Sequence, residues 1–129
     1  MRFLGIDYGR RRIGVALSDL EGRIAFPKNV ILNEGAAIKE LRVLAEAQDA
    51  GQIVIGLPLA LDGGETEESG RVRAFAEALK IELNLPCVFE NEIFTTRMAE
   101  AQGKGKLSDA SAAAIILQSY LDKQKARNT

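Results

Sequence analysis

Residues 3–17, FLGIDYGRRRIGVAL, contain two short apolar segments separated by a glycine and three arginines. This pattern predicts a strand over residues 2–8, a turn, and a second strand over residues 13–17. Asp7 closes the first strand, where an ionised carboxylate is costly unless something pairs with it. Glycines lie two residues away on either side, so another backbone or a ligand can approach closely. The stretch therefore predicts a β-hairpin that carries an acid in need of a partner.

The chain continues with a third strand and then with alternating helical and apolar patterns. A strand over residues 23–32 is interrupted by Pro27, which favours an edge position in a sheet. The later predicted elements are, in chain order, a helix over 35–48, a buried strand over 52–57, a loop over 59–69, a helix over 70–83 and a strand over 87–89. An antiparallel meander that feeds into crossover connections indicates an α/β fold. We therefore expect a mixed five-stranded sheet with helices on both faces.

The C-terminal part of the chain predicts two more helices. A threonine pair can cap a short helix over 95–102, and Ser108 can cap a final helix that runs to about Lys123. Residues 124–129 are expected to form a frayed tail. Because no repeat or linker interrupts the pattern, we expect one domain over residues 1–129.

The composition restricts the chemistry. The chain has no histidine and one cysteine, Cys87, which excludes serine–histidine and cysteine–histidine nucleophiles and any zinc site built from histidines or thiolates. Hydrolysis would have to use carboxylates, lysine, or a metal ion that acidifies water. A single cysteine also suits a reducing compartment, and no apolar run approaches the roughly 20 residues that span a bilayer. We therefore expect a cytoplasmic protein with no membrane partner.

The net charge of −1 means that a nucleic-acid partner would have to bind a local basic patch. Candidate clusters for this role include Arg10, Arg11 and Arg12 in the predicted hairpin, and Lys104 and Lys106 between the last two predicted helices. The alternative for each cluster is an ordinary solvated turn. The arginine cluster is the stronger candidate, because it shares its hairpin with Asp7.

Two further acids could join Asp7. Glu92 follows the strand over 87–89, and Asp109 lies on the inward-facing stripe of the final helix. An ordinary loop acid and a favourable helix-dipole contact are the alternatives. If the crossover strands run parallel to the first strand, the three carboxylates converge and raise one another's pKa unless a cation neutralises them. All-oxygen ligands select Mg²⁺ or Mn²⁺, and two such ions can cleave a phosphodiester without histidine.

Four motifs in the chain match those of a known family, in the same order. They are Gly5–Gly9 with Arg12–Ala16, Ile55–Leu59 with Asp62 and Gly63, Thr95–Thr96 with Ala99, and Lys106–Asp109 with Ala112, Ala113 and Ile116–Asp122. Together they resemble the YqgF family of the ribonuclease H-like superfamily, which is related to the RuvC-type Holliday-junction resolvases. The resemblance covers nearly the whole chain and implies a ribonuclease H-like domain.

The resemblance also implies a function. Asp7, Glu92 and Asp109 occupy the positions of the family's metal-binding and catalytic acids, so it implies a nuclease that uses Mg²⁺ or Mn²⁺, with two ions bound. The implied substrate is structured RNA at the 5′ end of pre-16S ribosomal RNA. Branched DNA, as in junction resolution, is the alternative. A monomer or a weak dimer is expected.

One departure from the family keeps another alternative open. The third motif has Asn91-Glu92-Ile93 where the family has Asp-Glu-Arg, so an acid and a cation beside the glutamate are missing. A non-catalytic nucleic-acid-binding factor on the same fold is therefore a second hypothesis. A sugar-kinase or actin-like ATPase is excluded by length, because that fold needs two such lobes.

Overall fold

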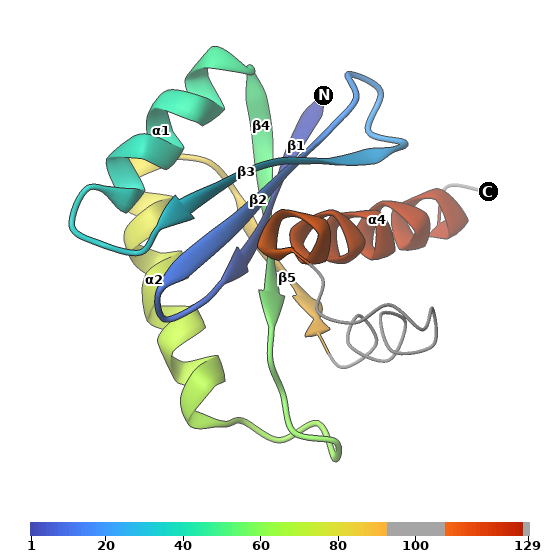
Figure 1. Cartoon of the computed structure of the whole chain (residues 1–129). Coiled ribbons are helices and arrows are strands. Elements are labelled where there is room, and N and C mark those ends of the chain that lie inside the picture. The colour runs from blue at the N-terminus through green and yellow to red at the C-terminus, as the bar shows by residue number, and fades with distance from the viewer. Residues whose placement is uncertain (93–107, 128–129) are drawn as a thin grey trace.

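The computed structural model describes residues 1–92 and 108–127. The strands are β1 (Arg2–Tyr8), β2 (Arg12–Ser18), β3 (Ala25–Leu32), β4 (Ala50–Leu57) and β5 (Cys87–Asn91). The helices are α1 (Ala37–Ala47), α2 (Glu67–Leu83) and α4 (Asp109–Arg127). The five strands form one sheet, as Figure 1 shows and as the sequence predicts. The short helix predicted over 95–102 lies outside the described residues.

The sheet is mixed, and its strand order is β3-β2-β1-β4-β5. β1 pairs with β2 and β2 with β3 in antiparallel ladders, which confirms the predicted meander. β1 pairs with β4 and β4 with β5 in parallel ladders. The carboxyl ends of β1, β4 and β5 therefore meet at one edge of the sheet. Asp7 near the end of β1 and Glu92 just after β5 both lie at this edge.

Helices cover both faces of the sheet, as predicted (Figure 1). The main core joins α1 and α2 to the large aliphatic residues of β1, β2 and β4, among them Leu4, Ile6 and Ile55. A smaller core joins α4 to the opposite face, with Ala16, Val54 and Leu117 at its centre. Successive side chains in a strand point to opposite faces, so each strand contributes to both cores. Among the described residues, no helix is both long and apolar enough to cross a bilayer.

Two predicted helix boundaries are wrong. α2 begins at Glu67, three residues before the expected start, because Thr66 forms a capping box with Ser69. The Thr66 hydroxyl oxygen accepts from the Ser69 N–H at 3.0 Å, and the Ser69 hydroxyl oxygen accepts from the Thr66 N–H at 2.7 Å. At the other end of the chain, α4 continues past Lys123, so the residues expected to fray remain helical as far as Arg127. The basic last turn suits the helix dipole.

β3 lies at the edge of the sheet, as its proline predicts. Its ladder with β2 shifts register at this proline: Val15 pairs with Asn29 and Ala16 with Pro27, which leaves Lys28 as an extra residue in a bulge. The N–H of Val30 donates to the side-chain oxygen of the preceding Asn29 at 2.9 Å. The edge strand is thus irregular where the proline interrupts it.

Candidate active site

Glycines on three strands let α4 lie close to the sheet. A Cβ built on Gly14 would be 1.9 Å from the carbonyl oxygen of Asp109, far inside any real contact distance. A Cβ on Gly5 would be 2.7 Å from the Cβ of Leu117, and one on Gly56 would be 2.6 Å from the Cδ1 of Ile116. A larger residue at Gly5 or Gly14 would move the helix away from the sheet, whereas at Gly56 it would first displace the tip of the Ile116 side chain.

This close approach brings Asp109 next to Asp7. Gly14 is the β2 residue directly opposite Asp7 in the antiparallel ladder, and the first turn of α4 sits over it. Asp7 points to the same face as Gly5, because the two residues are two apart in the strand. The negative charge of Asp109 contributes to raising the pKa of Asp7. The prediction that Asp109 faces the sheet toward Asp7 is therefore consistent with this packing.

Asp7 and Glu92 form a hydrogen-bonded pair of carboxyl groups. Burial raises the pKa of Asp7, and the hydrogen bond with Glu92 opposes that rise. Burial, the hydrogen bond to Asp7 and the charges of Asp7 and Glu68 together raise the pKa of Glu92 to about 8. At neutral pH, Glu92 therefore keeps its proton and donates it to Asp7. A cation can take the place of the proton between two such carboxyl groups.

Asp109 has a different partner. Its Oδ2 forms an ion pair with Arg12, 3.0 Å from Nε, and both side chains are partly exposed. Among residues 1–92 and 108–127, no group of three acids is arranged to hold a metal ion. The structure thus brings Asp7 and Glu92 into contact and places Asp109 nearby, paired with an arginine.

The predicted basic residues divide into three groups. Arg10 donates to Glu68 from Nε and Nη2, at 3.2 and 3.0 Å, and Arg12 holds Asp109. Arg11 is exposed and has no ion-pair partner within the described part of the chain. Lys104 and Lys106 lie outside the described residues. The arginine cluster therefore borders the acids, although two of its members are engaged with carboxylates.

Sequence reasoning missed two acids near this edge. Glu68 lies in the first turn of α2 and not in the predicted loop over 59–69, because the Thr66 cap starts the helix earlier. Glu90 is 4% exposed and accepts from the Ser119 hydroxyl and the Lys123 ammonium, both at 2.6 Å. A spacing of two from Glu92 along an extended segment could have placed Glu90 on the face of α4. Glu90 anchors α4 to β5, whereas Glu68 faces the arginine cluster.

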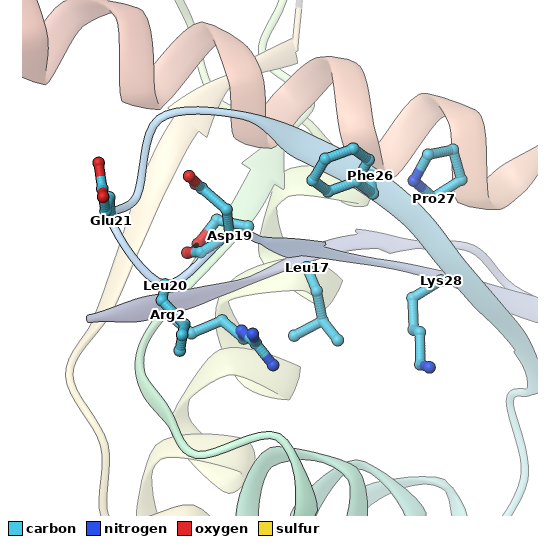
Figure 2. A pocket seen from close by; sticks show the side chains of 9 residues that line it. Arg2, Leu17, Asp19, Leu20, Glu21, Phe26, Pro27 and Lys28 are labelled. Atoms are coloured by element: carbon cyan, nitrogen blue, oxygen red, sulfur yellow. Dashed lines mark hydrogen bonds between the residues drawn. The ribbon is translucent and has the colours of Figure 1, made fainter.

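A separate hollow of about 530 Å³ lies at the opposite end of β1 from Asp7. Figure 2 shows Arg2 and Lys28 on either side of Leu17 in its lining. Acidic Asp19 and Glu21 also line it, so its charges are mixed. It contains none of the predicted site residues.

Known proteins are similar to this chain along most of its length. Residues 1–123 match the family described as "RuvX: Holliday junction resolvase". A protein of Nitratidesulfovibrio vulgaris (strain DSM 19637 / Miyazaki F), named "Putative pre-16S rRNA nuclease", is 37% identical over 140 residues, covering 100% of this chain and 99% of that protein. A protein of Leifsonia xyli with the same name is 40% identical over 134 residues, covering 95% and 86%.

Solved structures share the fold. RuvC of T. thermophilus in complex with a Holliday junction substrate has a TM-score of 0.63 at 13% identity, covering 97% of this chain and 96% of that one. At this identity the likeness is one of fold alone, and it confirms the predicted ribonuclease H-like architecture.

Proposed function

This chain belongs to the RuvX family, and from that premise we propose that it is a metal-dependent nuclease that hydrolyses phosphodiester bonds in the 5′-end processing of pre-16S ribosomal RNA. One observation of the structure carries the proposal. The carboxyl groups of Asp7, near the end of β1, and Glu92, just after β5, are hydrogen-bonded to each other at the carboxyl edge of the sheet. Open α/β sheets bind their ligands at this edge. The expected setting is the reducing cytoplasm.

The donor set fits a divalent cation. Burial and mutual repulsion make two ionised carboxylates unfavourable at this edge, and a cation would relieve both costs in place of the shared proton. We propose that Asp7 and Glu92 hold Mg²⁺ or Mn²⁺, because both are hard oxygen donors. Asp109 would join them by giving up its ion pair with Arg12 and binding the cation instead. Two ions are the arrangement we favour for a phosphodiester.

Bound divalent cations supply an activated water and stabilise charge on the leaving oxygen. The chain's own residues do the rest. Asp7 lies on β1 and Glu92 directly follows β5 in the same sheet, so both carboxyl groups are held at one edge of it. Arg12, once released by Asp109, is free to donate to a phosphate oxygen of the substrate.

Junction resolution on branched DNA is the second candidate, because the matching family is described by that activity. A resolvase cuts two strands symmetrically and therefore needs a two-fold dimer. The third candidate is a nucleic-acid-binding factor without activity. It is kept because Asn91, the residue before Glu92, provides an amide where the family has an acid.

One experiment separates these candidates. Wild type, Asp7→Asn and Asp49→Asn are incubated with a ribosomal precursor RNA and with a four-way DNA junction, each in Mn²⁺ or EDTA. Asp49 is the matched control, because it is exposed at the far end of the sheet, before β4, and its left-handed backbone (φ 54°) suits asparagine.

We expect precursor RNA to be cut in Mn²⁺ only, and Asp7→Asn to lose at least about 100-fold in rate, since losing even an outer-shell partner of a metal site costs 10–100-fold. Asp49→Asn should match wild type. Preferential cleavage of the junction would favour resolution. Cleavage that survives EDTA or the Asp7 substitution would exclude the metal mechanism, and RNA binding without cleavage would indicate the binding factor.

A further inference from the structure

Two arginines from different elements converge on one carboxylate oxygen. Arg10, in the turn between β1 and β2, donates to Oε1 of Glu68 from Nε at 3.2 Å and from Nη2 at 3.0 Å. Arg71, one turn further along α2, donates to the same oxygen from Nη1. Glu68 thus brings together two guanidinium groups that belong to separate parts of the fold.

These contacts can be exchanged at low cost. The side chains of Arg10, Glu68 and Arg71 are 67%, 43% and 41% exposed. Ion pairs this exposed contribute little to stability, because water and salt screen them. A phosphate group also offers oxygens that suit guanidinium forks, and it carries a full negative charge. Glu68 therefore occupies a position that suits a phosphate.

The arginine pair also lies beside the acids. The negative charge of Glu68 acts on Glu92 and contributes to raising the pKa of that carboxyl group. Arg10 follows Asp7 by three residues, on the turn that leaves β1. A nucleic-acid strand with one phosphate at Asp7 and Glu92 would therefore pass close to Arg10 and Arg71.

We propose that Arg10 and Arg71 form a phosphate-binding subsite for the nucleic-acid strand beside the cleavage position, and that Glu68 fills this subsite until a strand displaces its carboxylate. The inference rests on the proposed function for the identity of the ligand. It adds a substrate-binding role for Arg71 and a self-blocking role for Glu68. Arg12 and Asp109 make a second, separate pair at the same edge.

The test measures binding without cleavage. A fluorescein-labelled 16-nucleotide RNA from a 5′ leader junction of 16S rRNA is titrated with wild type, Glu68→Gln and Glu82→Gln in EDTA at low salt. Glu82 is the matched control, since it accepts from Arg42 at 3.0 Å near the other end of α2. Both substitutions remove one negative charge from the same helix, about 20 Å apart at 1.5 Å per residue.

Glu68→Gln should bind the RNA about fivefold more tightly than wild type, because a weak ion pair no longer competes with phosphate. Glu82→Gln should stay within about twofold of wild type, as a surface charge outside the subsite. Equal effects of the two substitutions would overturn the subsite. So would the absence of RNA binding by both wild type and Glu68→Gln at low salt.

Arginine variants provide the second arm. Arg71→Ala should weaken binding and lower the slope of log affinity against log salt by about 0.7, the value for one phosphate contact on a single strand. In the Arg10→Ala/Arg71→Ala background, Glu68→Gln should no longer raise affinity. A persistent gain there would contradict the inference. Thermal unfolding checks that each variant is folded. Because EDTA prevents metal binding, failure here is distinct from failure of the Mn²⁺ cleavage assay.

Discussion

The two faces of the sheet are made from alternate residues of the same strands, yet they are filled differently. Toward α1 and α2 the strands present large, fully buried aliphatic side chains, such as Leu4, Ile6 and Val15. Toward α4, β1 and β2 present several small or acidic residues, namely Gly5, Asp7, Gly14 and Ala16. The larger Phe3 and Val54 also belong to the core on this face.

The face toward α1 and α2 therefore mainly stabilises the fold, whereas the face toward α4 determines where Asp109 lies. Large side chains fill the space beneath α1 and α2 and stabilise the fold by burying apolar surface. Small residues beneath α4 bury less, but they let the backbone of its first turn come within contact distance of β2. That approach is what brings Asp109 beside Asp7. Changes on the two faces should therefore have different consequences.

Gly14→Ala should have the largest effect. Its Cβ would overlap the backbone oxygen of Asp109, so the start of α4 must move away from Asp7. We expect a loss of about 2 kcal/mol in the free energy of unfolding, typical of overpacking. We also expect at least about a 100-fold loss of cleavage, the cost of a displacement near 1 Å in a catalytic geometry.

Gly70→Ala is the matched control for this change. It lies within α2, and a Cβ there meets nothing within 4 Å. It should stabilise the protein by roughly 0.5–1 kcal/mol, because alanine favours helix. Urea unfolding and the Mn²⁺ cleavage assay measure both variants. Normal cleavage by a folded Gly14→Ala protein would contradict the role assigned to the close approach.

Leu41→Ala should destabilise the core beneath α1 and α2 without disturbing the candidate site. Leu41 on α1 is fully buried in the main core. Its truncation should cost about 3 kcal/mol of unfolding free energy, through lost burial and the cavity that remains. The cleavage rate per folded molecule should stay within about twofold of wild type, since sites without shared partners act independently. A large drop in that rate would show that the two faces are coupled.

The pH dependence of stability should report on the protonation of Glu92. In the folded metal-free protein the pKa of Glu92 is about 8, raised from 4.5. Between these values the folded protein keeps a proton that the unfolded chain has released. Stability is therefore greatest at low pH within this window and falls as pH rises toward 8. The fall should be roughly 1–3 kcal/mol, at about 1.4 kcal/mol per pKa unit.

Glu92→Gln tests this assignment, because a neutral amide cannot lose a proton. Thermal unfolding in EDTA between pH 5 and 8 should show a much weaker dependence for the variant than for wild type. Mn²⁺ should stabilise wild type more at pH 8 than at pH 6, since the metal competes with the shared proton. Parallel curves for the two proteins would show that another group titrates.

The sequence predicts much of this fold because strong local patterns agree with the tertiary structure. Apolar runs predicted all five strands, and Pro27 predicted the edge. The start of α2 was missed because its cap is a threonine–serine pair followed by Gly70, a weak helix former. The end of α4 was missed because its last turn is polar and charged. Local patterns alone cannot determine such boundaries.

The proximity of two of the candidate acids was predictable, whereas the contacts of the other charged residues were not. Asp7 and Glu92 were expected at one edge because parallel strands end together, and the structure places them in contact. The pairing of Asp109 with Arg12, and of Glu68 with Arg10, joins elements distant in sequence. Such pairings depend on how the helices sit on the sheet, which no short motif encodes.

The bulge in β3 has a consequence for the behaviour of the protein at high concentration. An edge strand with free N–H and C=O groups is a template for pairing with another chain, which leads to aggregation. Here Pro27 has no N–H to offer, and the N–H of Val30 is already bound by Asn29. The charged Lys28 is the extra residue of the bulge between them, and a charge on an edge strand further discourages a second strand. The irregular edge thus resists intermolecular β-sheet growth despite the exposed Phe26 and Leu32 along the same strand.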